Sequence, residues 1–396
     1  MSISDAPRFA WRGLRLDTSR HYYPVRTITS TLDAMAAAKL NVLMWHIIDG
    51  QSFPLVSELY PELSAKGAYC PQCVYSPDAV RSVVEHARML GIRVHAEIDV
   101  PGHSGFGYGR PDLIACPKFE AFRGAGRAFD PTQDATYAFL KAFLLETAAL
   151  FPEPTLNLNG DEVQFECWAS NPRVAAWASA HNLSYPELEQ HFWTRMNEPG
   201  GVVRALTAAG KTMVVAEGSN PKEGSVNLSK SGFPSDTIAE VWGDATLSSG
   251  IKRVLSTYPT ARAIVGGPYY LDVMNPYQPG EPAAAKVVYA WMDSWATFYQ
   301  AEPFADPSLT AAEKARVLGG VAEMWSERLD ATSVASFIWP RALAVAERLW
   351  SPADFLLDPN ATAPRMARAA CQVLERRGVR GGAVEPGFCP WSLDWE

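Results

Sequence analysis

The stretch Asn41-Val-Leu-Met-Trp-His-Ile-Ile-Asp49 is the most informative one for the fold. It is a short β-rich run that ends in an acidic residue and lies between two helical patterns. An Ala-rich helical pattern over Ile28–Lys39 precedes it. A second helical pattern, Pro77–Leu90, follows the N-cap residue Ser76 and has Pro at its first position. Short β-rich runs and longer helical patterns alternate in this way along the chain. The alternation predicts parallel strands joined by helical crossovers.

The same pattern predicts eight strands. They are Arg12–Asp17, Asn41–Asp49, Arg93–Val100, Thr155–Glu162, Thr212–Glu217, Thr237–Trp242, Arg262–Tyr270 and Leu318–Trp325. Further helices are predicted at Ala135–Leu150, Tyr185–Ala209, Arg341–Trp350 and Pro364–Arg377. A (β/α)8 TIM barrel closes with eight parallel strands joined by helical crossovers, which is the number predicted here.

A doubly wound sheet is the rival fold. It usually has a Gly-rich phosphate turn after its first strand, whereas Thr-Ser-Arg-His-Tyr-Tyr follows Asp17 here. We therefore predict an α/β protein with a single TIM barrel, a C-terminal helix and no internal domain boundary. The segment Asp272–Thr310 is long and rich in Pro and aromatic residues, which predicts an active-site loop.

Composition excludes several classes of protein. Hydrophobic residues make up 47% of the 396 residues, which is incompatible with wholesale disorder. The net charge of −8 and the lack of a basic block argue against nucleic acid as a partner. No run reaches the ~18 apolar residues of a membrane helix. The first 13 residues contain no hydrophobic stretch, so we expect no signal peptide in this chain.

Six cysteines are present, at Cys70, Cys73, Cys116, Cys167, Cys371 and Cys389. An even number fits disulfides in an oxidising compartment, although buried free thiols are the alternative for any one of them. Cys70 and Cys73 are closely spaced, but no second such pair completes a zinc site, so we predict no metal. Glycosylation sequons at Asn182, Asn227 and Asn360 support secretion only slightly.

Acidic residues recur at or just past the ends of the predicted strands. They are Asp17, Asp49, Asp99, Asp161, Glu162, Glu217 and Glu327. In a barrel every strand delivers that end to the catalytic face. A single acid at such a place is more often a helix N-cap or a turn former, but that explanation is poor for the whole set.

Two motifs in this set are informative. In Asn157-Leu-Asn159-Gly-Asp161-Glu162 the strand period puts the two Asn residues and Asp161 on one face, and the turn lets both carboxylates reach the barrel mouth. Adjacent acids repel, which raises the pKa of one and gives the acid and carboxylate that glycosidases need. In Asp99-Val-Pro-Gly-His103 the tight turn aims His103 across the mouth, although a turn histidine bonded to backbone is equally expected.

The chain also resembles a known family. Its motifs occur in the order Arg12-Gly-Leu-Arg-Leu-Asp-Thr-Ser-Arg20-His-Tyr-Tyr-Pro, Leu40-Asn-Val-Leu-Met-Trp-His46-Ile-Ile-Asp49, Ala96-Glu-Ile-Asp99-Val-Pro-Gly-His103, Gly160-Asp161-Glu162-Val and Ala346-Glu-Arg-Leu-Trp350-Ser. They resemble family 20 glycoside hydrolases, in particular the lysosomal-type β-hexosaminidase subunits of eukaryotes. The resemblance runs from about Pro7 to Cys389. It implies that residues 7–396 are the catalytic barrel and that the N-terminal α/β domain of that family is absent.

The resemblance implies removal of terminal β-linked N-acetylglucosamine or N-acetylgalactosamine by a retaining, substrate-assisted mechanism, without cofactor or metal. Glu162 matches the general acid, and Asp161 matches the residue that orients the 2-acetamido group. Tyr270 matches the hydroxyl that holds the acetamido oxygen, while Asp49 and His103 match a relay behind the acid. Among the substrate-binding residues, Arg20 and Glu327 match groups that bind the ring hydroxyls, and Trp242 and Trp325 match aromatic walls of the sugar pocket. Asp272, followed by Val273, matches the subunit type that prefers neutral sugars.

The resemblance further implies the disulfides Cys116–Cys167 and Cys371–Cys389, a homodimer, and a lysosomal or secreted setting; it gives Cys70 and Cys73 no role. Some positions depart from the family pattern, namely Gly50, Asn157, Asn159 and Ala216, of which Ala216 removes an aromatic pocket wall. Two alternatives therefore stay open. One is a barrel that binds N-acetylated sugars without catalysis, and the other is a related barrel glycosidase that releases a disaccharide or cuts chitin internally.

Overall fold

The computed structural model describes residues 5–120, 126–217, 226–242, 247–272, 274–275, 291–292, 295–355, 358–384 and 389. Eight parallel strands close into a barrel in the order β1-β10-β7-β6-β5-β4-β3-β2. The strands are β1 (Trp11–Asp17), β2 (Val42–Ile48), β3 (Arg93–Ile98), β4 (Thr155–Asn159), β5 (Thr212–Glu217), β6 (Ile238–Val241), β7 (Arg262–Val265) and β10 (Val317–Met324). The predicted (β/α)8 barrel and its eight strands are confirmed.

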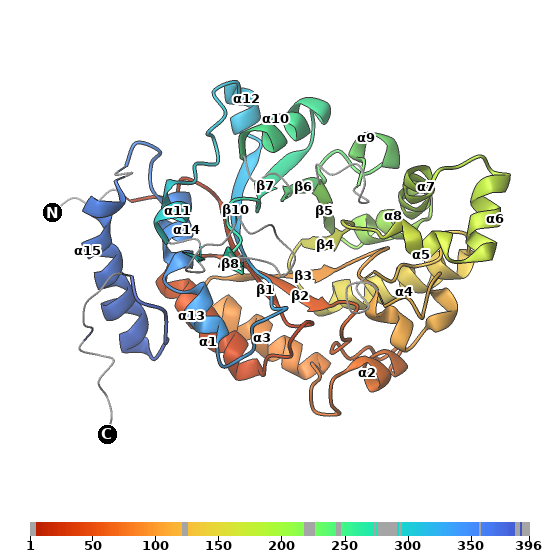
Figure 1. Cartoon of the computed structure of the whole chain (residues 1–396), viewed down its shortest axis with the longest axis horizontal. Coiled ribbons are helices and arrows are strands. Elements are labelled where there is room, and N and C mark those ends of the chain that lie inside the picture. Colours follow the sequence, from red (N-terminus) through yellow and green to blue (C-terminus); the bar gives the residue numbers. More distant parts are fainter. Residues whose placement is uncertain are drawn as a thin grey trace, which may run out of the picture.

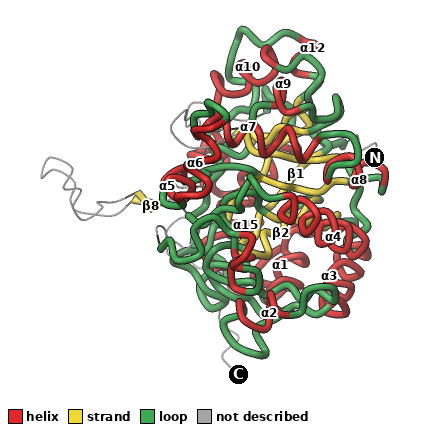
Figure 2. Tube along the Cα trace, turned by 90° about the vertical axis from the view of Figure 1, so that its right-hand side faces the viewer, coloured by secondary structure: helices red, strands yellow, loops and turns green. Residues whose placement is uncertain are grey.

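Helices surround the strands, which lie at the centre of Figure 1 and are yellow in Figure 2. The helices are α1 (Val25–Ala37), α2 (Glu62–Gly67), α3 (Pro77–Met89), α4 (Asp134–Leu150), α5 (Phe165–Ala169), α6 (Pro172–Ala180), α7 (Tyr185–Asn197), α8 (Val202–Ala208), α9 (Leu228–Ser231), α10 (Leu247–Thr257), α11 (Trp295–Gln300), α12 (Ala311–Lys314), α13 (Val334–Ile338), α14 (Arg341–Trp350) and α15 (Pro359–Ala369). Short helical turns cover Gly105–Tyr108, Pro111–Leu113, Ala370–Leu374 and Glu375–Arg377. A small hairpin joins β8 (Met274–Asn275) and β9 (Trp291–Met292).

Two predicted helices differ from the structure. The predicted helix Tyr185–Ala209 is two helices, α7 and α8, because Gly200 adopts a left-handed φ of 79° between them. The C-terminal helix begins at Pro359 rather than Pro364, since Asp358 caps it by accepting from the Asn360 backbone N–H. The predicted cap at Ser76 is confirmed, with its side chain accepting from the Ala79 N–H.

Two predicted strands are too long. The predicted strand Thr155–Glu162 ends at Asn159, which has a positive φ, as has Gly160. The predicted strand Arg262–Tyr270 ends at Val265, where Gly266 and Gly267 both donate to the Val241 carbonyl. Residues 273, 276–290 and 293–294 of the predicted loop Asp272–Thr310 lie outside the described residues, and its described part includes β8, β9 and α11. Its role as an active-site loop stays a prediction.

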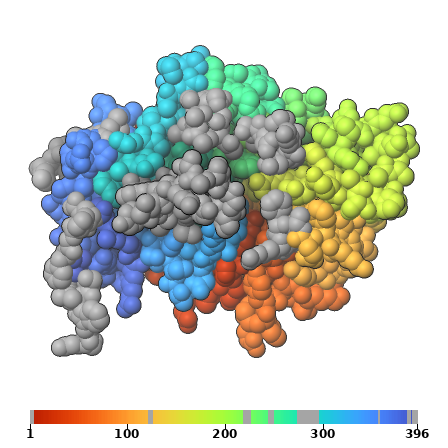
Figure 3. Space-filling model, in the orientation of Figure 1, coloured from red at the N-terminus to blue at the C-terminus, as the bar shows by residue number. Residues whose placement is uncertain are grey.

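The barrel interior has two layers of different character. Near the strand starts it is apolar, with Trp11, Val42, Met44, Val214, Ile238, Ile264 and Val321 in one buried cluster. Because successive side chains alternate between faces, the next interior positions toward the strand ends belong to Arg15, Glu97, Glu240 and Glu323, which are all buried. The barrel closes where β1 pairs with β10, so the N- and C-terminal parts of the chain lie together, red beside blue in Figure 3.

Among the described residues, each helix is too short or too polar to cross a lipid bilayer.

Closure of the barrel depends on one close backbone approach. Gly319 on β10 has a φ of 147°, and a Cβ there would lie 1.8 Å from the Trp11 carbonyl oxygen. We expect Gly319→Ala to lower the free energy of unfolding in urea by about 3 kcal/mol or more, because backbone atoms of β1 cannot move aside. The control is Gly91→Ala, which has a φ of 72° but open space, and which we expect to cost about 1 kcal/mol. Equal losses would contradict this account.

Candidate active site

The turn after β4 brings two carboxylates to the carboxyl end of the barrel. Asn159 and Glu162 have φ values near 49° and Gly160 has a φ of 101°, so the chain reverses sharply. Gly160 is required there, because a Cβ would lie 2.6 Å from both Trp193 and Val226. Asp161 is half-buried, and the side chain of Glu162 is 41% exposed. Two non-glycine residues in left-handed conformations within four positions mark a strained turn of the kind that clusters at functional sites.

His103 lies between Asp49 and Glu162. Its Nδ1 is 3.0 Å from Asp49 Oδ2, and its Nε2 is 3.5 Å from Glu162 Oε2. His103 is itself held in a left-handed conformation with a φ of 49°. The structure thus brings together the three residues that the sequence predicted as a relay and its acid.

Burial and charge set the protonation of this group. Burial opposes the charge on His103, but Asp49 outweighs it and raises the pKa of His103 well above its usual range. The hydrogen bond from His103 lowers the pKa of Glu162. Burial, with the charges of Glu162 and Glu97, raises the pKa of Asp161. Crowding therefore raises the pKa of one acid, as expected, but that acid is Asp161, and the opposite shifts of His103 and Glu162 favour a proton on His103 over one on Glu162.

Arg20 is fixed at the centre of several acids. Its Nη2 lies 2.6 Å from Asp49 Oδ2, and its Nη1 lies 3.3 Å from Asp17 Oδ2. Its Nε lies 3.9 Å from Glu327 Oε1, whose side chain is 52% exposed. The guanidinium stacks over the ring of Trp325 at 4.9 Å. Arg20 and Glu327, the two residues predicted to bind ring hydroxyls, are therefore neighbours, with Arg20 buried among acids and Glu327 open to solvent.

A cavity of about 740 Å³ opens beside these groups. Its lining includes four predicted site residues, Arg20, His103, Glu162 and Glu327. It also includes Tyr69, which the sequence analysis did not single out and whose hydroxyl donates to the Arg20 carbonyl at 2.9 Å. No pattern in the sequence marks Tyr69, because it precedes a disulfide-closed turn far from every strand end.

Other predicted site residues lie deeper or to one side. Tyr270 is half-buried and pairs through its backbone with Glu323, and Trp242 directly follows β6. The described residues that line the cavity do not include five of the predicted site residues, namely Tyr270, Trp242, Asp161, Trp325 and Asp272.

Trp325 lies edge-on to His46 at 5.0 Å, and the Arg20 guanidinium lies 4.9 Å from its ring centroid. Asp272 is half-buried, and burial with the charge of Glu327 raises its pKa to about 7. Val273 lies outside the described residues.

Glu217 does not belong to the site, contrary to the expectation that all the acids at strand ends face the barrel mouth. It pairs with Arg253 of α10 at 2.7 Å and is close to Tyr258. The reason is the strand alternation, which turns Ala216 inward beside its register partner Glu240 and turns Glu217 outward. The predicted inward position of Ala216 fits this register.

A charged cluster on the barrel axis was not predicted. Arg15 donates from Nε to Glu97 at 2.9 Å, from Nη1 to Glu323 at 2.5 Å and from Nη2 to Glu240 at 2.7 Å. Asn157 completes the cluster by donating to Glu97 at 3.0 Å and to Glu240 at 3.2 Å. The signal in the sequence was present, since Arg15 and Glu97 precede the selected acids Asp17 and Asp99 by one strand period.

The other departures from the family pattern have structural partners. Asn159 donates to Asp99 Oδ2 at 3.1 Å, which ties β4 to β3. The Gly50 N–H donates to Asp49 Oδ1, and the Gly50 carbonyl accepts from the Tyr108 hydroxyl at 3.0 Å. Both residues therefore help to hold acids of the site in place.

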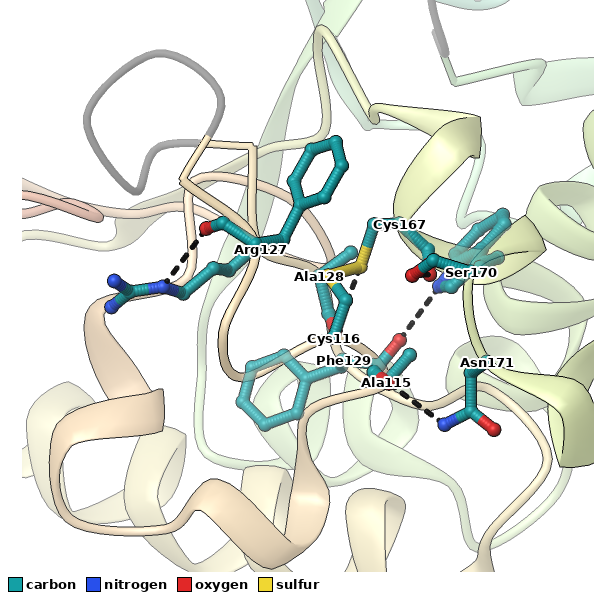
Figure 4. The surroundings of a disulfide bond; sticks show 10 residues. Ala115, Cys116, Arg127, Ala128, Phe129, Cys167, Ser170 and Asn171 are labelled. Atoms are coloured by element: carbon teal, nitrogen blue, oxygen red, sulfur yellow. Dashed lines mark hydrogen bonds between the residues drawn. A yellow bond between two sulfur atoms is a disulfide. The ribbon is translucent and has the colours of Figure 1, made fainter.

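All six cysteines form disulfides, the predicted Cys116–Cys167 and Cys371–Cys389 together with Cys70–Cys73. Figure 4 shows that Cys116–Cys167 joins the segment after β3 to α5, which follows the Asp161–Glu162 turn. Asn171 reinforces this link by donating to the Ala115 carbonyl at 2.7 Å. The loop that carries His103 and the turn that carries Glu162 are therefore held together.

Among the described residues, three groups of side chains have ligand atoms close enough to share a metal ion. They are His46, Asp49 and Asp99; His103, Asp161 and Glu162; and Cys371, Glu375 and Cys389, whose two cysteines are joined in a disulfide. Arg20 pairs directly with Asp49, so its positive charge opposes a cation in the first group. The prediction that the protein needs no metal or cofactor stays a prediction.

Comparisons with known proteins agree with this geometry. The model of the family described as glycosyl hydrolase family 20, catalytic domain, matches residues 9–353. The β-hexosaminidase subunit beta of Homo sapiens is 37% identical over 393 residues, which cover 98% of this chain and 65% of the relative. The β-hexosaminidase subunit alpha of Bos taurus is 37% identical over 398 residues, which cover 99% of this chain and 69% of that relative. The chain therefore spans about two thirds of the length of these relatives.

A solved structure shares the fold. The chitobiase of Flavobacterium johnsoniae has a TM-score of 0.77 and 28% sequence identity, and the match covers 94% of this chain and 52% of that one.

The disulfides differ in the length of chain they close. Cys116–Cys167 spans 51 positions, whereas Cys70–Cys73 spans 3. In the chain-entropy account, we expect the double substitution Cys116→Ser with Cys167→Ser to lower the free energy of unfolding by about 4 kcal/mol, and the matched Cys70→Ser with Cys73→Ser by about 1.6 kcal/mol. Urea unfolding of the two double variants measures both losses. A greater loss from the Cys70–Cys73 pair would refute this ranking.

Proposed function

Because the chain belongs to glycosyl hydrolase family 20, we propose that it is an exo-acting β-N-acetylhexosaminidase that releases terminal N-acetylglucosamine or N-acetylgalactosamine from glycans. The observation that carries this proposal is the contact of Glu162 with the Asp49–His103 pair at the edge of a cavity that Arg20 also lines. A cavity of about 740 Å³ is in the range of small-molecule sites.

The proposed reaction is retaining and substrate-assisted. The acetamido oxygen of the substrate attacks the anomeric carbon while the glycosidic C–O bond breaks and Glu162 gives its proton to the leaving oxygen. Asp161 accepts from the acetamide N–H and stabilises the positive oxazolinium, and Tyr270 donates to the acetamide oxygen. Water then attacks the anomeric carbon, Glu162 accepts its proton, and the ring of the oxazolinium opens to restore the acetamide.

His103 supplies the proton that Glu162 needs. In the ligand-free protein His103 holds it, and Glu162 is ionised. A sugar seated over the exposed part of Glu162 removes water, which disfavours the carboxylate and favours transfer of the proton from His103 Nε2 to Glu162 Oε2. Asp49 keeps the other ring nitrogen of His103 protonated and so fixes its orientation.

Arg20 and Glu327 are suited to the ring hydroxyls. Arg20 is held by Asp17 and Asp49, so it presents donors without rotamer freedom, and Glu327 offers exposed acceptor oxygens beside it. Trp325, below Arg20, and Trp242, at the end of β6, are the proposed apolar walls.

We expect Glu162→Gln to lower kcat/KM for 4-nitrophenyl N-acetyl-β-glucosaminide by about 10²- to 10⁴-fold, because proton transfer is lost while the contact with His103 is kept. The loss on N,N′-diacetylchitobiose will be larger, since a sugar leaving group needs the proton more than a nitrophenolate does. The matched control is Glu217→Gln, an acid at a strand end that faces away from the site and whose loss leaves the rates near wild type.

The same assay separates the alternatives. A wild-type protein that binds N-acetylglucosamine but turns over neither substrate between pH 4 and pH 8 would be a binding module, for which the small Ala216 in the barrel interior is the observation in favour. Release of disaccharides, or internal cutting of chitin, would replace the exo-enzyme by another glycosidase. Inhibition by a sugar thiazoline, which mimics the oxazolinium, tests the substrate-assisted route.

Asp272 is proposed to select neutral sugars. Its pKa of about 7 means that it is protonated at acid pH and becomes anionic as the pH rises through 7. We therefore expect the preference for 4-nitrophenyl N-acetyl-β-glucosaminide over its 6-sulfate to grow with pH across this range, because the ionised carboxylate repels sulfate. Asp272→Asn should remove the pH dependence of this ratio. Equal rates on both substrates at pH 8 would contradict the role.

Setting and assembly follow from the same proposal. Three disulfides fit a lysosomal or secreted location, where thiols are oxidised. N-acetylhexosamine-terminated glycans are the proposed ligands, and a homodimer is the proposed assembly. Residues 7–396 are proposed to act as one catalytic barrel.

A further inference from the structure

A continuous series of contacts links the barrel axis to Glu162. Arg15 Nε donates to Glu97 Oε2 at 2.9 Å, and Glu97 Oε1 lies 2.8 Å from His46 Nδ1. His46 Nε2 lies 3.1 Å from Asp49 Oδ2, the same oxygen that contacts His103 Nδ1 at 3.0 Å. His103 Nε2 then reaches Glu162 at 3.5 Å. Each residue before Glu162 is buried, so water does not screen these contacts.

The series uses both ring nitrogens of both histidines. Each imidazole bridges two carboxylates, His46 between Glu97 and Asp49, and His103 between Asp49 and Glu162. Asp49 is therefore shared by the two rings. Arg20 also contacts Asp49, at 2.6 Å, so the protonation of one ring affects the other through this carboxylate.

We propose that Arg15, Glu97 and His46 are positioning residues, which extend the Asp49–His103 relay to the barrel axis and so govern how tightly the His103–Glu162 pair holds its proton. The catalytic consequence rests on the proposed function, whereas the coupling between the rings does not. Arg15 fixes Glu97, Glu97 fixes the ring of His46, and His46 sets the charge that Asp49 presents to His103.

The acids around Arg15 provide a matched pair for the test. Burial disfavours the ionised form of Glu97, but Arg15 and His46 outweigh it and lower the pKa of Glu97 to about 2. Burial, with the charges of Glu240 and Glu97, raises the pKa of Glu323 well above its usual range despite the same arginine. Glu97 contacts both Arg15 and His46, whereas among the described residues Glu323 shares the contact with Arg15 but not one with His46. Glu97→Gln therefore changes a member of the series, whereas Glu323→Gln changes a carboxyl group beside it.

The charged groups that face the two rings come from several elements. His103 is faced by Asp49, Arg20, Asp161 and Glu162, and His46 is faced by Glu97, Asp49, Asp99 and Arg20. Burial opposes the charge on His46, but these acids outweigh it and raise its pKa to about 10. His46 is thus a cation next to Asp49 at working pH.

The experiment titrates the His103 ring by NMR in protein labelled with ¹⁵N-histidine. We expect Glu97→Gln to lower the pKa of His103 by about one unit, because a buried negative charge is lost from the series. We expect His46→Gln to raise it, because a cation next to Asp49 is lost. Glu323→Gln should leave it within about 0.2 units, since Glu323 contacts Arg15 but lies outside the series from Glu97 to His103. Glu97→Asp, which keeps the charge, should stay closer to wild type than Glu97→Gln.

The opposite signs distinguish coupling from damage. A general loosening of the site would shift the His103 titration in the same direction in every variant, and that result would overturn the proposal. Equal shifts in Glu97→Gln and Glu323→Gln would also overturn it, as would no shift in Glu97→Gln. Thermal unfolding identifies a variant that does not fold. If Glu97→Gln is one of these, the upward shift in His46→Gln, or its absence, decides the question.

Catalysis gives a second reading. The alkaline limb of kcat/KM against pH, measured with 4-nitrophenyl N-acetyl-β-glucosaminide, should move to lower pH in Glu97→Gln and to higher pH in His46→Gln, and stay in place in Glu323→Gln. If the wild-type protein shows no turnover, the proposed function is contradicted, but the NMR titrations still test the coupling between the rings. If the protein is active but the pKa of His103 does not change in Glu97→Gln or His46→Gln, only the further inference is contradicted.

Discussion

Charged side chains can remain inside this barrel only because each lies beside an opposite charge. Arg15 meets three glutamates, and Arg20 meets Asp17 and Asp49, all within 3.3 Å. Breaking such a buried pair by removing one partner typically costs about 3–5 kcal/mol, because the remaining charge is left without water. The pairing therefore holds the carboxyl half of the barrel together, and it also fixes the orientation of the groups that the site uses.

The strained turns depend on this scaffold. His103, Asn159 and Glu162 all adopt left-handed backbone conformations, which cost about 1–3 kcal/mol each when nothing compensates. Asn159 is bonded to Asp99, His103 to Asp49, and the Cys116–Cys167 disulfide joins the two loops. Several independent contacts therefore hold each turn in its left-handed conformation.

The small residue Ala216 changes the interior of the barrel at one level. It faces inward beside its register partner Glu240. Arg15 and Asn157 both donate to Glu240, so charged and amide groups occupy the barrel interior at the level of Ala216.

Some properties could be predicted from the sequence because they depend on local order. The alternation of β-rich runs and helices predicted the barrel, and the run Thr155–Glu162 placed two acids at a strand end. The errors also have local causes, since Gly200 divides a predicted helix and Glu217 turns outward by the strand alternation.

Tertiary structure decided which side chains meet. Arg15 and Glu323 are 308 positions apart and touch only because β1 and β10 close the barrel. Likewise, Asp49, His103 and Glu162 follow three separate strands, β2, β3 and β4, and their protonation depends on burial and on neighbours from other elements. A sequence fixes the type and order of its side chains, whereas distance and desolvation, which set charge, exist only once the chain has closed.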